Sequence, residues 1–315
     1  MQKVFLSRVS VINQEPGGSS PRSVPRFRRA ITRAVVAVMM VLVALDLVVA
    51  WRYWNDSRSL AHLAQSLVAA ADPPSEKMRA VASFLHYKVD QKRTEDYFLL
   101  PIFSCLRPTA AQVIEGGGDC AYKARAFIVL LRHLGIEASK LALYDPSGKP
   151  VHAVALAQTE RGPYVVDLRF GIVFDDAQGY PIPLKSLKAD RRVLNDVVDR
   201  EVAVGNAWCR KYKRDRFVYD NVRTINWEKN AAWRLVYQAL AATCGAEAVD
   251  HFARPYCAEE PALLVMIGTS GLLLGIVIML PLWRARRGRR QQANQPRSSG
   301  YTENEPELAS VGADV

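Results

Sequence analysis

Two long apolar stretches constrain this chain more than any other feature. They span residues 34–51 and 262–283, and each is close to the roughly 20 apolar residues that a helix needs to cross a bilayer. We expect two transmembrane helices, the first an uncleaved signal-anchor, because a long basic leader precedes it and no Ala-x-Ala cleavage site follows it. A buried core helix is the alternative for the first stretch, although such helices seldom stay apolar on every face.

One charged residue, Asp46, lies within these stretches and belongs to the first. An acidic side chain inside a bilayer can mark a contact with a partner. We instead expect Asp46 to lie near the end of the span and to reach for lipid headgroups.

The charges beside the two stretches predict their orientation. Acidic residues Asp250, Glu259 and Glu260 precede the second stretch. Arginines precede the first stretch and follow the second, namely Arg22, Arg26, Arg28, Arg29, Arg33, Arg284, Arg286, Arg287, Arg289 and Arg290. Positive flanks stay in the cytoplasm, so we place the spans in a bacterial inner (plasma) membrane, both termini in the cytoplasm and the segment between them in the periplasm or another extracytoplasmic space. This topology explains the net charge of +11, and no nucleic-acid partner is predicted.

The chain is therefore expected to have five parts, with one globular domain in the middle. Both ends are rich in Pro, Gly, Ser, Gln and Glu, which leaves little to bury, and the central segment has the size of a single domain. The parts are a basic disordered tail (1–33), a transmembrane helix (34–51), an exported domain (52–261, core 75–180), a second transmembrane helix (262–283) and a basic, then polar, disordered tail (284–315).

The cysteines fit an exported domain with one reactive thiol. They are Cys105, Cys120, Cys209, Cys244 and Cys257. An odd number suggests pairs plus one free thiol, so if Cys120 is a nucleophile the other four can form two disulfides in any of three pairings. We favour Cys244 with Cys257. Buried reduced thiols are an equally weighted alternative.

The segment around Cys120 is placed for chemistry. A glycine run at residues 116–118 leads through Asp119 into the helical pattern AYKARAFIVLLRHLG, which Gly135 should end. The stripe that we expect it to bury is Ala124, Phe127, Ile128, Leu131 and Leu134. Free N–H groups and the helix dipole at its first turn favour a thiolate and can hold an oxyanion. The glycines would let a substrate backbone approach.

Helices are also expected before this segment, and strands after it. Asp72 reads as the N-cap of the helix SEKMRAVASFLHYKV, with Pro73 and Pro74 following it. A short helix, TAAQVIEG, comes next. Three strand-like runs follow the cysteine helix, namely SKLALYD, VHAVALAQT and PYVVDLRFGIVF.

A thiolate nucleophile needs a base that can return the proton, which favours histidine. His133 points away from Cys120 on the same helix, whereas His152 opens a strand next to a turn. Asp167 lies on the following strand. A hairpin turn at residues 159–160 would place it opposite His152, and a turn at residues 160–161 would make the two diagonal neighbours on one face. Either arrangement lets the carboxylate orient the imidazole.

The stretch 107–173 resembles the core of the transglutaminase-like superfamily. Its motifs read GGGDC, LLRHLGIEAS, VHAVAL and YVVDLRFG, and the helix SEKMRAVASFLHYKV resembles the helix before that core. The resemblance implies a papain-like α+β fold between the two transmembrane helices, with the cysteine helix packed on an antiparallel sheet. It also implies Cys120 as nucleophile, His152 as base and then acid, and Asp167 as its orienting carboxylate.

The resemblance further implies that the Cys120 N–H is one oxyanion donor. Gln112 and Tyr122 are guesses for the second. Members of the family usually carry an aromatic residue soon after the histidine, where this chain has Val154.

Two functions remain open at this point. In the first, a membrane-anchored enzyme forms a thioester at Cys120, which water resolves in a peptidase or amidase and an amine resolves in an acyltransferase. We favour hydrolysis of a protein or peptide in the cell envelope. In the second, the chemistry has lapsed and the domain is a binding or scaffold module of an envelope or polysaccharide-related assembly.

No cofactor and no metal site is predicted, because Cys and His residues are too scattered for zinc-ligand spacing. A calcium site at Asp145, Asp175 and Asp176 is speculation. The basic and aromatic segment 210–242 could line a cleft for an acidic or glycan-like ligand, but a core helix with a solvated face explains it more simply.

Overall fold

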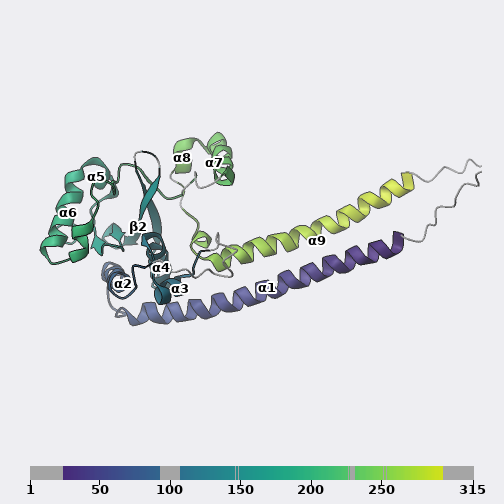
Figure 1. The fold of residues 1–315 in the computed structure, drawn as a ribbon, viewed down its shortest axis with the longest axis horizontal. Helices are drawn as coiled ribbons and strands as arrows, with labels where there is room; N and C mark the ends of the chain where they lie inside the picture. The colour runs from purple at the N-terminus through teal and green to yellow at the C-terminus, as the bar shows by residue number, and fades with distance from the viewer. Residues whose placement is uncertain are drawn as a thin grey trace, which may run out of the picture. The chain divides into compact units, whose positions relative to one another are not determined.

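The computed structural model describes residues 24–92, 107–145, 149–225 and 231–293, without residues 251 and 253 and with Ser147 and Trp227 added. It forms two compact units, Met1–Thr269 and Ser270–Val315. The first unit combines helices with an antiparallel sheet (Figure 1). This is the mixed α and β fold that the sequence predicts, with a candidate membrane-spanning helix on each side of the domain.

Helix α1 (Val24–Ser66) is longer than the first apolar stretch and continues into the domain. Its segment from Ala30 onward is long and apolar enough to cross a membrane. Its last turns pack on α3 and α4 and bury Leu60 and Ala64 in the core. Residues 24–33 are therefore helical, and the disordered tail expected there is wrong for those residues. Residues 1–23 lie outside the described part of the chain.

Helix α9 (Pro261–Ala293) contains the second apolar stretch. Its first turns pack against α1, where Val49 and Ala262 are buried together. The Thr269 hydroxyl donates a hydrogen bond to the Asp46 carboxylate. The expectation that Asp46 reaches for headgroups is therefore wrong, because it bonds to the chain's own second apolar helix.

The second unit contains the rest of α9. The large apolar side chains along it are mostly exposed, as expected of a helix that faces lipid. They include Leu272, Leu274, Val277, Ile278, Met279 and Leu282. The helix continues to Ala293, so the disordered tail expected from residue 284 is wrong for residues 284–293. Residues 294–315 lie outside the described part.

The sheet has five strands in the order β4-β3-β2-β1-β5, and all neighbours are antiparallel. The strands are β1 (Ala138–Tyr144), β2 (Pro150–Thr159), β3 (Gly162–Asp167), β4 (Ile172–Val173) and β5 (Val222–Arg223). The third predicted strand is thus two strands, separated by a turn with Gly171 at φ +69°. The two-residue strand β5 carries too short a pattern to be found from sequence.

The helices around this sheet are short. They are α2 (Pro74–Tyr87), α3 (Ala110–Gly116), α4 (Cys120–His133), α5 (Leu184–Ala189), α6 (Arg191–Ala203), α7 (Ala231–Cys244) and α8 (Ala246–Asp250), with 3₁₀ turns η2 (Ala207–Lys211) and η3 (Tyr256–Ala258). Helix α2 begins after Pro73, not after Asp72 as predicted, since the Asp72 carboxylate accepts a hydrogen bond from the Ala69 N–H instead. Helix α3 begins with the capping box of Thr109 and Gln112.

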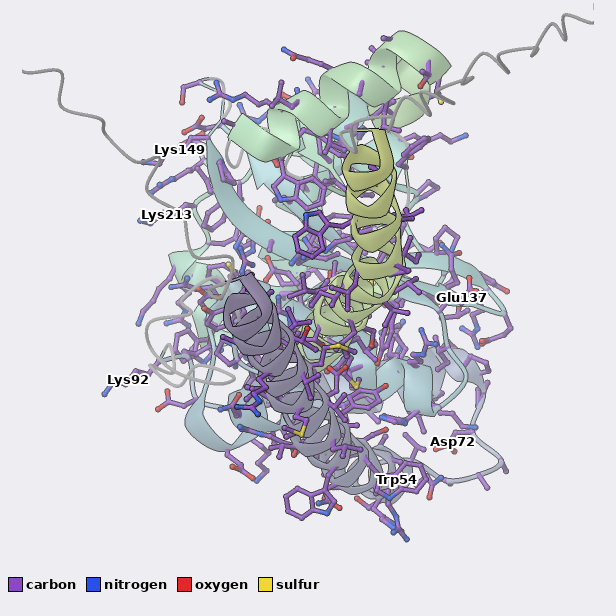
Figure 2. All side chains as sticks on the ribbon, turned by 90° about the vertical axis from the view of Figure 1, so that its right-hand side faces the viewer. Trp54, Asp72, Lys92, Glu137, Lys149 and Lys213 are labelled. Atoms are coloured by element: carbon purple, nitrogen blue, oxygen red, sulfur yellow. The ribbon has the colours of Figure 1, made fainter. Side chains whose placement is uncertain are left out.

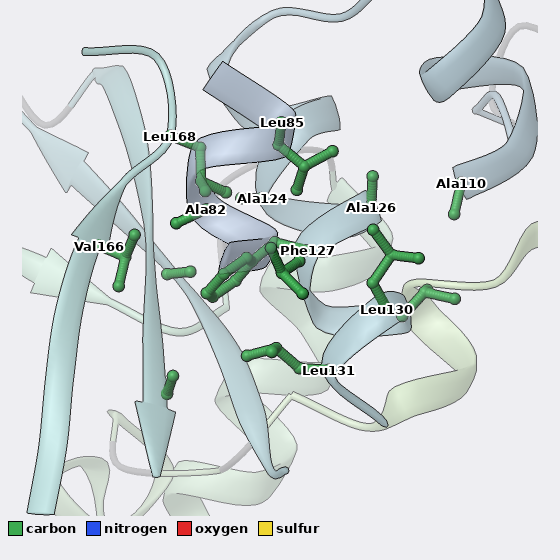
Figure 3. Close-up of a cluster of buried hydrophobic side chains, with 14 of the residues drawn as sticks. Ala82, Leu85, Ala110, Ala124, Ala126, Phe127, Leu130, Leu131, Val166 and Leu168 are labelled. Atoms are coloured by element: carbon green, nitrogen blue, oxygen red, sulfur yellow. The ribbon is translucent and has the colours of Figure 1, made fainter. Parts of the chain in front are cut away.

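Helix α4 lies at the centre of the domain and is buried on every side along residues 122–131. It packs on β1 and β2 on one side and on α1, α2 and α3 on the others. Figure 3 shows Phe127 and Leu131 of α4 directed toward the strand that carries Val166. The predicted apolar stripe is therefore too narrow, and Lys123 and Arg125 are buried with it.

The two faces of the sheet belong to two separate cores, as the two-residue alternation of strands requires. Ala155 and Val166 join the core around α4. Val154 and Val165 join the second core, which includes Leu187 of α5 and side chains of α6 and η2. Val154, at the position where the resembled family usually carries an aromatic residue, thus fills this second core.

The glycine run before Cys120 allows the chain to pack against itself. Gly117 has φ +88°, and a Cβ there would lie 2.5 Å from the Lys92 carbonyl oxygen. The close approach that the structure shows is therefore to the chain's own backbone, and no substrate is needed to explain the glycine.

Gly117→Ala is expected to lower the free energy of unfolding by about 2–3 kcal/mol, because it combines a strained φ with a backbone clash. Urea denaturation of the full chain in detergent measures this. Gly135→Ala is the control, since Gly135 has φ +75° but a Cβ there would meet no atom within 4 Å, and it should cost about 1 kcal/mol. Equal losses in the two variants would contradict the packing argument.

Candidate functional site

Cys120 is the first residue of α4, and its neighbour Asp119 caps the helix. The Asp119 carboxylate accepts hydrogen bonds from the N–H groups of Ala121 and Tyr122, both at 3.0 Å, and its carbonyl accepts one from Lys123 at 2.9 Å. Within the described residues, this leaves the Cys120 N–H as the amide of the first turn without an acceptor. A helix N-terminus concentrates partial positive charge, so this amide is available to an anion that forms at the Cys120 sulfur.

His152 and Asp167 form a buried pair on neighbouring strands. His152 Nε2 lies 2.6 Å from Asp167 Oδ2, and Asp167 has no exposed surface. The second carboxylate oxygen, Oδ1, accepts hydrogen bonds from the N–H groups of Arg169 and Phe170 at 3.1 and 3.3 Å. Both oxygens are thus held, and the carboxylate has a fixed orientation toward the imidazole.

The register of the hairpin explains how the two side chains meet. Thr159 pairs with Gly162, so the turn is at residues 160–161, the second of the two predicted turns. Ala155 pairs with Val166, which makes His152 and Asp167 diagonal neighbours. Diagonal neighbours on one face are within reach of long side chains.

Cys120 is near enough to His152 to affect the pKa of its imidazole. Nε2 is taken by Asp167, and Nδ1 has no hydrogen-bond partner in the described part of the chain, so Nδ1 is the ring nitrogen available to the thiol. Burial lowers the pKa of His152, but the Asp167 carboxylate and then Cys120 outweigh this and raise the pKa from 6.5 to about 10. The imidazolium is therefore the favoured form at neutral pH.

Aromatic side chains from segments between the strands cover the histidine. Phe217 stacks on the His152 ring with centroids 4.4 Å apart, and Phe170 meets it edge-on at 5.8 Å. Tyr212 packs on both phenylalanines. Our interpretation of the sequence assigned residues 210–242 to a core helix or a ligand cleft and missed this role. Its one signal is the run of aromatic residues from Tyr212 to Tyr219.

The two guesses for a second oxyanion donor have other roles in the structure. The Gln112 side-chain oxygen accepts a hydrogen bond from the Thr109 N–H and so caps α3. The Tyr122 ring is buried in the core around α4. Neither position needs an oxyanion role to be explained.

The aspartates considered for calcium are used elsewhere. Asp175 pairs with Arg79 and Arg200 at 2.5 and 2.6 Å. Asp145 and Asp176 each accept backbone hydrogen bonds in their own turns. No group of three or more potential metal ligands occurs among the residues that the structure describes.

The predicted disulfide between Cys244 and Cys257 is wrong, because both are free thiols in the structure. Cys209 is free and buried, with its sulfur 3.6 Å from the Phe170 carbonyl oxygen. Burial raises the pKa of the Cys209 thiol to about 12, so this thiol fits the alternative of a buried reduced cysteine. Cys105 lies outside the described residues.

Comparison with known proteins gives one match. Residues 61–159 match the family model of the transglutaminase-like superfamily. No curated protein and no solved structure matches the chain. The matched segment contains Cys120 and His152 and ends before Asp167. The catalytic roles of the three residues are a prediction that these comparisons do not test.

Proposed function

Because this chain carries a domain of the transglutaminase-like superfamily, we propose that it is a thiol enzyme that cleaves or transfers an amide acyl group at Cys120. Such domains belong in general to cysteine hydrolases and acyltransferases. The observation that carries the proposal is the position of His152, with Asp167 on one ring nitrogen, the other ring nitrogen unbonded in the described part of the chain, and Cys120 near enough to raise the pKa of the imidazole.

The proposed reaction uses these groups in turn. In the resting pair His152 already holds the thiol proton on Nδ1, and the Cys120 thiolate attacks the amide carbon. The oxygen of the tetrahedral intermediate accepts a hydrogen bond from the Cys120 N–H. His152 then protonates the leaving amine, which gives a thioester at Cys120. Asp167 holds the imidazolium throughout and keeps Nδ1 directed at the sulfur.

The thioester can be resolved by water or by an amine. We propose hydrolysis, as in a peptidase or amidase, with His152 as the base that activates the water. This choice rests on the family resemblance. Phe217 and Phe170 are buried and cover the His152 ring. This cover would shield the imidazolium from bulk water during the reaction.

We further propose that α1 and α9 anchor this domain in a bacterial inner membrane, with the domain on the extracytoplasmic side and an envelope protein or peptide as substrate. Two helices are long and apolar enough to span a bilayer. Arginines lie before the first and after the second, which supports cytoplasmic termini.

The proposal predicts a reactive Cys120. In the full chain purified in detergent, iodoacetamide should label Cys120 rapidly well below pH 8, because His152 stays protonated up to about pH 10 and an imidazolium stabilises the neighbouring thiolate. Mass spectrometry locates the label. The exposed Cys244 is the internal reference for the labelling rate.

His152→Ala should remove the labelling of Cys120 at low pH, and His133→Ala, at the other end of α4, should not. If Cys120 instead follows the pH profile of Cys244 and His152→Ala changes nothing, the enzyme proposal fails. The domain would then be a binding or scaffold module that retains the fold.

A further inference from the structure

A pocket lies at the far end of α4 from Cys120. It has a volume of about 600 Å³, within the usual range of ligand sites. Arg132, which lines it, is twelve residues, or about 18 Å along the helix axis, from Cys120. Residues of β1 and of the segment before α9 complete the lining, notably Lys140, Arg254, Tyr256 and Glu259. The pocket is therefore separate from the proposed catalytic groups.

Cations outnumber anions in the buried wall of this pocket. The Glu259 carboxylate lies 2.6 Å from Arg254 Nε, 3.4 Å from Arg125 Nε and 3.6 Å from Lys140 Nζ. Three cationic side chains thus share one carboxylate. Arg125 and Lys140 are almost fully buried, so solvent screens their charges weakly.

Two further acidic residues do not balance this charge. Glu137 lines the pocket but is exposed, and its charge is screened by water. Glu260 is buried, and burial raises its pKa to about 7, with Arg125 opposing this and Asp56 and Glu259 adding to it. A large fraction of Glu260 is therefore neutral at pH 7.

Lys140 is the lining residue whose side chain points most clearly to a ligand, because it is buried and its amine is unbonded in the described part of the chain. It is 5% exposed, and its Nζ has no hydrogen-bond acceptor in the described part of the chain. Burial lowers the pKa of Lys140 to about 7, with Glu259 opposing this, so a part of Lys140 is an ammonium at pH 7 and an anion nearby would increase that part. An ammonium has three N–H donors, and leaving them unbonded in the interior is costly. Lys140 lines the pocket, so an acceptor that entered the pocket would meet it.

We propose that this pocket binds a phosphate group, with Lys140 and Arg254 as the side chains that contact its oxygens. A phosphate has several strong acceptor oxygens, which would accept hydrogen bonds from Lys140, and a negative charge, which would neutralise the excess of cations. The inference does not depend on the chemistry of Cys120.

The phosphate could belong to a free ion or metabolite or to a lipid headgroup. Glu259 is two residues before Pro261, where the second apolar helix begins. If that helix crosses the membrane, the pocket wall is within a few residues of the bilayer surface. Anionic headgroups are known to occupy basic pockets next to membrane helices.

Thermal unfolding of the full chain tests the proposal. In neutral detergent, the melting temperature is titrated with sodium phosphate against sodium chloride at equal ionic strength. In a second arm, the chain is placed in phosphatidylglycerol bilayers and in phosphatidylcholine bilayers. Phosphate, or phosphatidylglycerol, should raise the melting temperature of the wild-type chain.

Lys140→Met should weaken this binding at least about tenfold, since a hydrogen bond to a charged group is lost. Lys149→Met is the matched control, because Lys149 is exposed and lies on the opposite side of the view in Figure 2 from Glu137 at the pocket. If Lys140→Met does not fold, Arg254→Gln takes its place with the same readout.

A response to phosphate in detergent identifies a free phosphate ligand, and a response confined to phosphatidylglycerol identifies a headgroup. Both support the proposal, provided that Lys140→Met or Arg254→Gln removes the response and Lys149→Met keeps it. Two results overturn it. One is that neither arm stabilises the wild-type chain. The other is that the pocket variants respond as the Lys149 control does.

Discussion

Asp167→Asn is expected to slow the labelling of Cys120 at pH 6 by two to four orders of magnitude. The substitution keeps the size and shape of the side chain and removes its charge. That charge is the main contribution that raises the pKa of His152 against the effect of burial. Without it, the imidazolium loses its proton at lower pH, and the thiolate loses its stabilising partner.

The hydrogen bonds around Asp167 should make Asp167→Asn slow the labelling of Cys120 by more than the loss of charge alone would. The N–H groups of Arg169 and Phe170 both donate to Oδ1. An asparagine would keep its carbonyl oxygen at that position, because its NH₂ group cannot accept those bonds. The NH₂ group would then face His152 Nε2. Two donors cannot bond to each other, so Nε2 must become an acceptor and the ring proton must move to Nδ1, where it blocks the transfer from Cys120.

The control for this variant is Asp199→Asn, which removes a carboxylate from an exposed ion pair with Arg214. It should leave the labelling rate unchanged, since exposed ion pairs contribute little. Rates are compared by mass spectrometry at pH 6 and pH 9. If Asp167→Asn labels Cys120 at the wild-type rate at pH 6, Asp167 does not act through His152.

The local signals around Cys120 and His152 are the ones that predict this structure well. A capped helix start, a glycine stop at Gly135 and period-two strands all depend on residues close in sequence. For the same reason the hairpin between β2 and β3 could be narrowed to two registers, one of which the structure has. Signals from residues close in sequence were therefore enough to predict that His152 and Asp167 lie near each other.

The features that sequence reasoning missed depend on contacts between distant segments. Phe217 covers His152 although 65 residues separate them along the chain, and no local pattern marks such a pair. Asp46 and Thr269 are a second case, since their hydrogen bond joins the two apolar helices. The third is Arg125, which is not part of the predicted apolar stripe of the cysteine helix but is buried beside the distant Glu259.

Glu259→Gln is the second variant for which we expect a large effect, a loss of about 3–5 kcal/mol in the free energy of unfolding. The carboxylate is the shared partner of Arg125, Lys140 and Arg254. Glutamine has nearly the same shape but no charge, so it would leave buried cations without a counter-ion. Urea denaturation in detergent measures the loss. Glu137→Gln, on the exposed rim of the same pocket, is the control and should change stability by no more than about 0.5 kcal/mol.

The pH dependence of this loss identifies its origin. Burial raises the pKa of Glu259, but Lys140, Arg254 and Arg125 outweigh this and hold it below the ordinary 4.5. A carboxyl group whose pKa is lowered by folding stabilises the fold above its unfolded pKa and loses that contribution as pH falls through its folded pKa. The difference between wild type and Glu259→Gln should therefore be largest between about pH 5 and 7 and shrink below about pH 4.5. It should also shrink above about pH 7, because burial lowers the pKa of Lys140 to about 7, with Glu259 opposing this, and Lys140 then loses its charge. A difference that stays constant down to about pH 3 would contradict this explanation. The loss of stability would then come from a change in packing caused by glutamine, and not from the missing charge of Glu259.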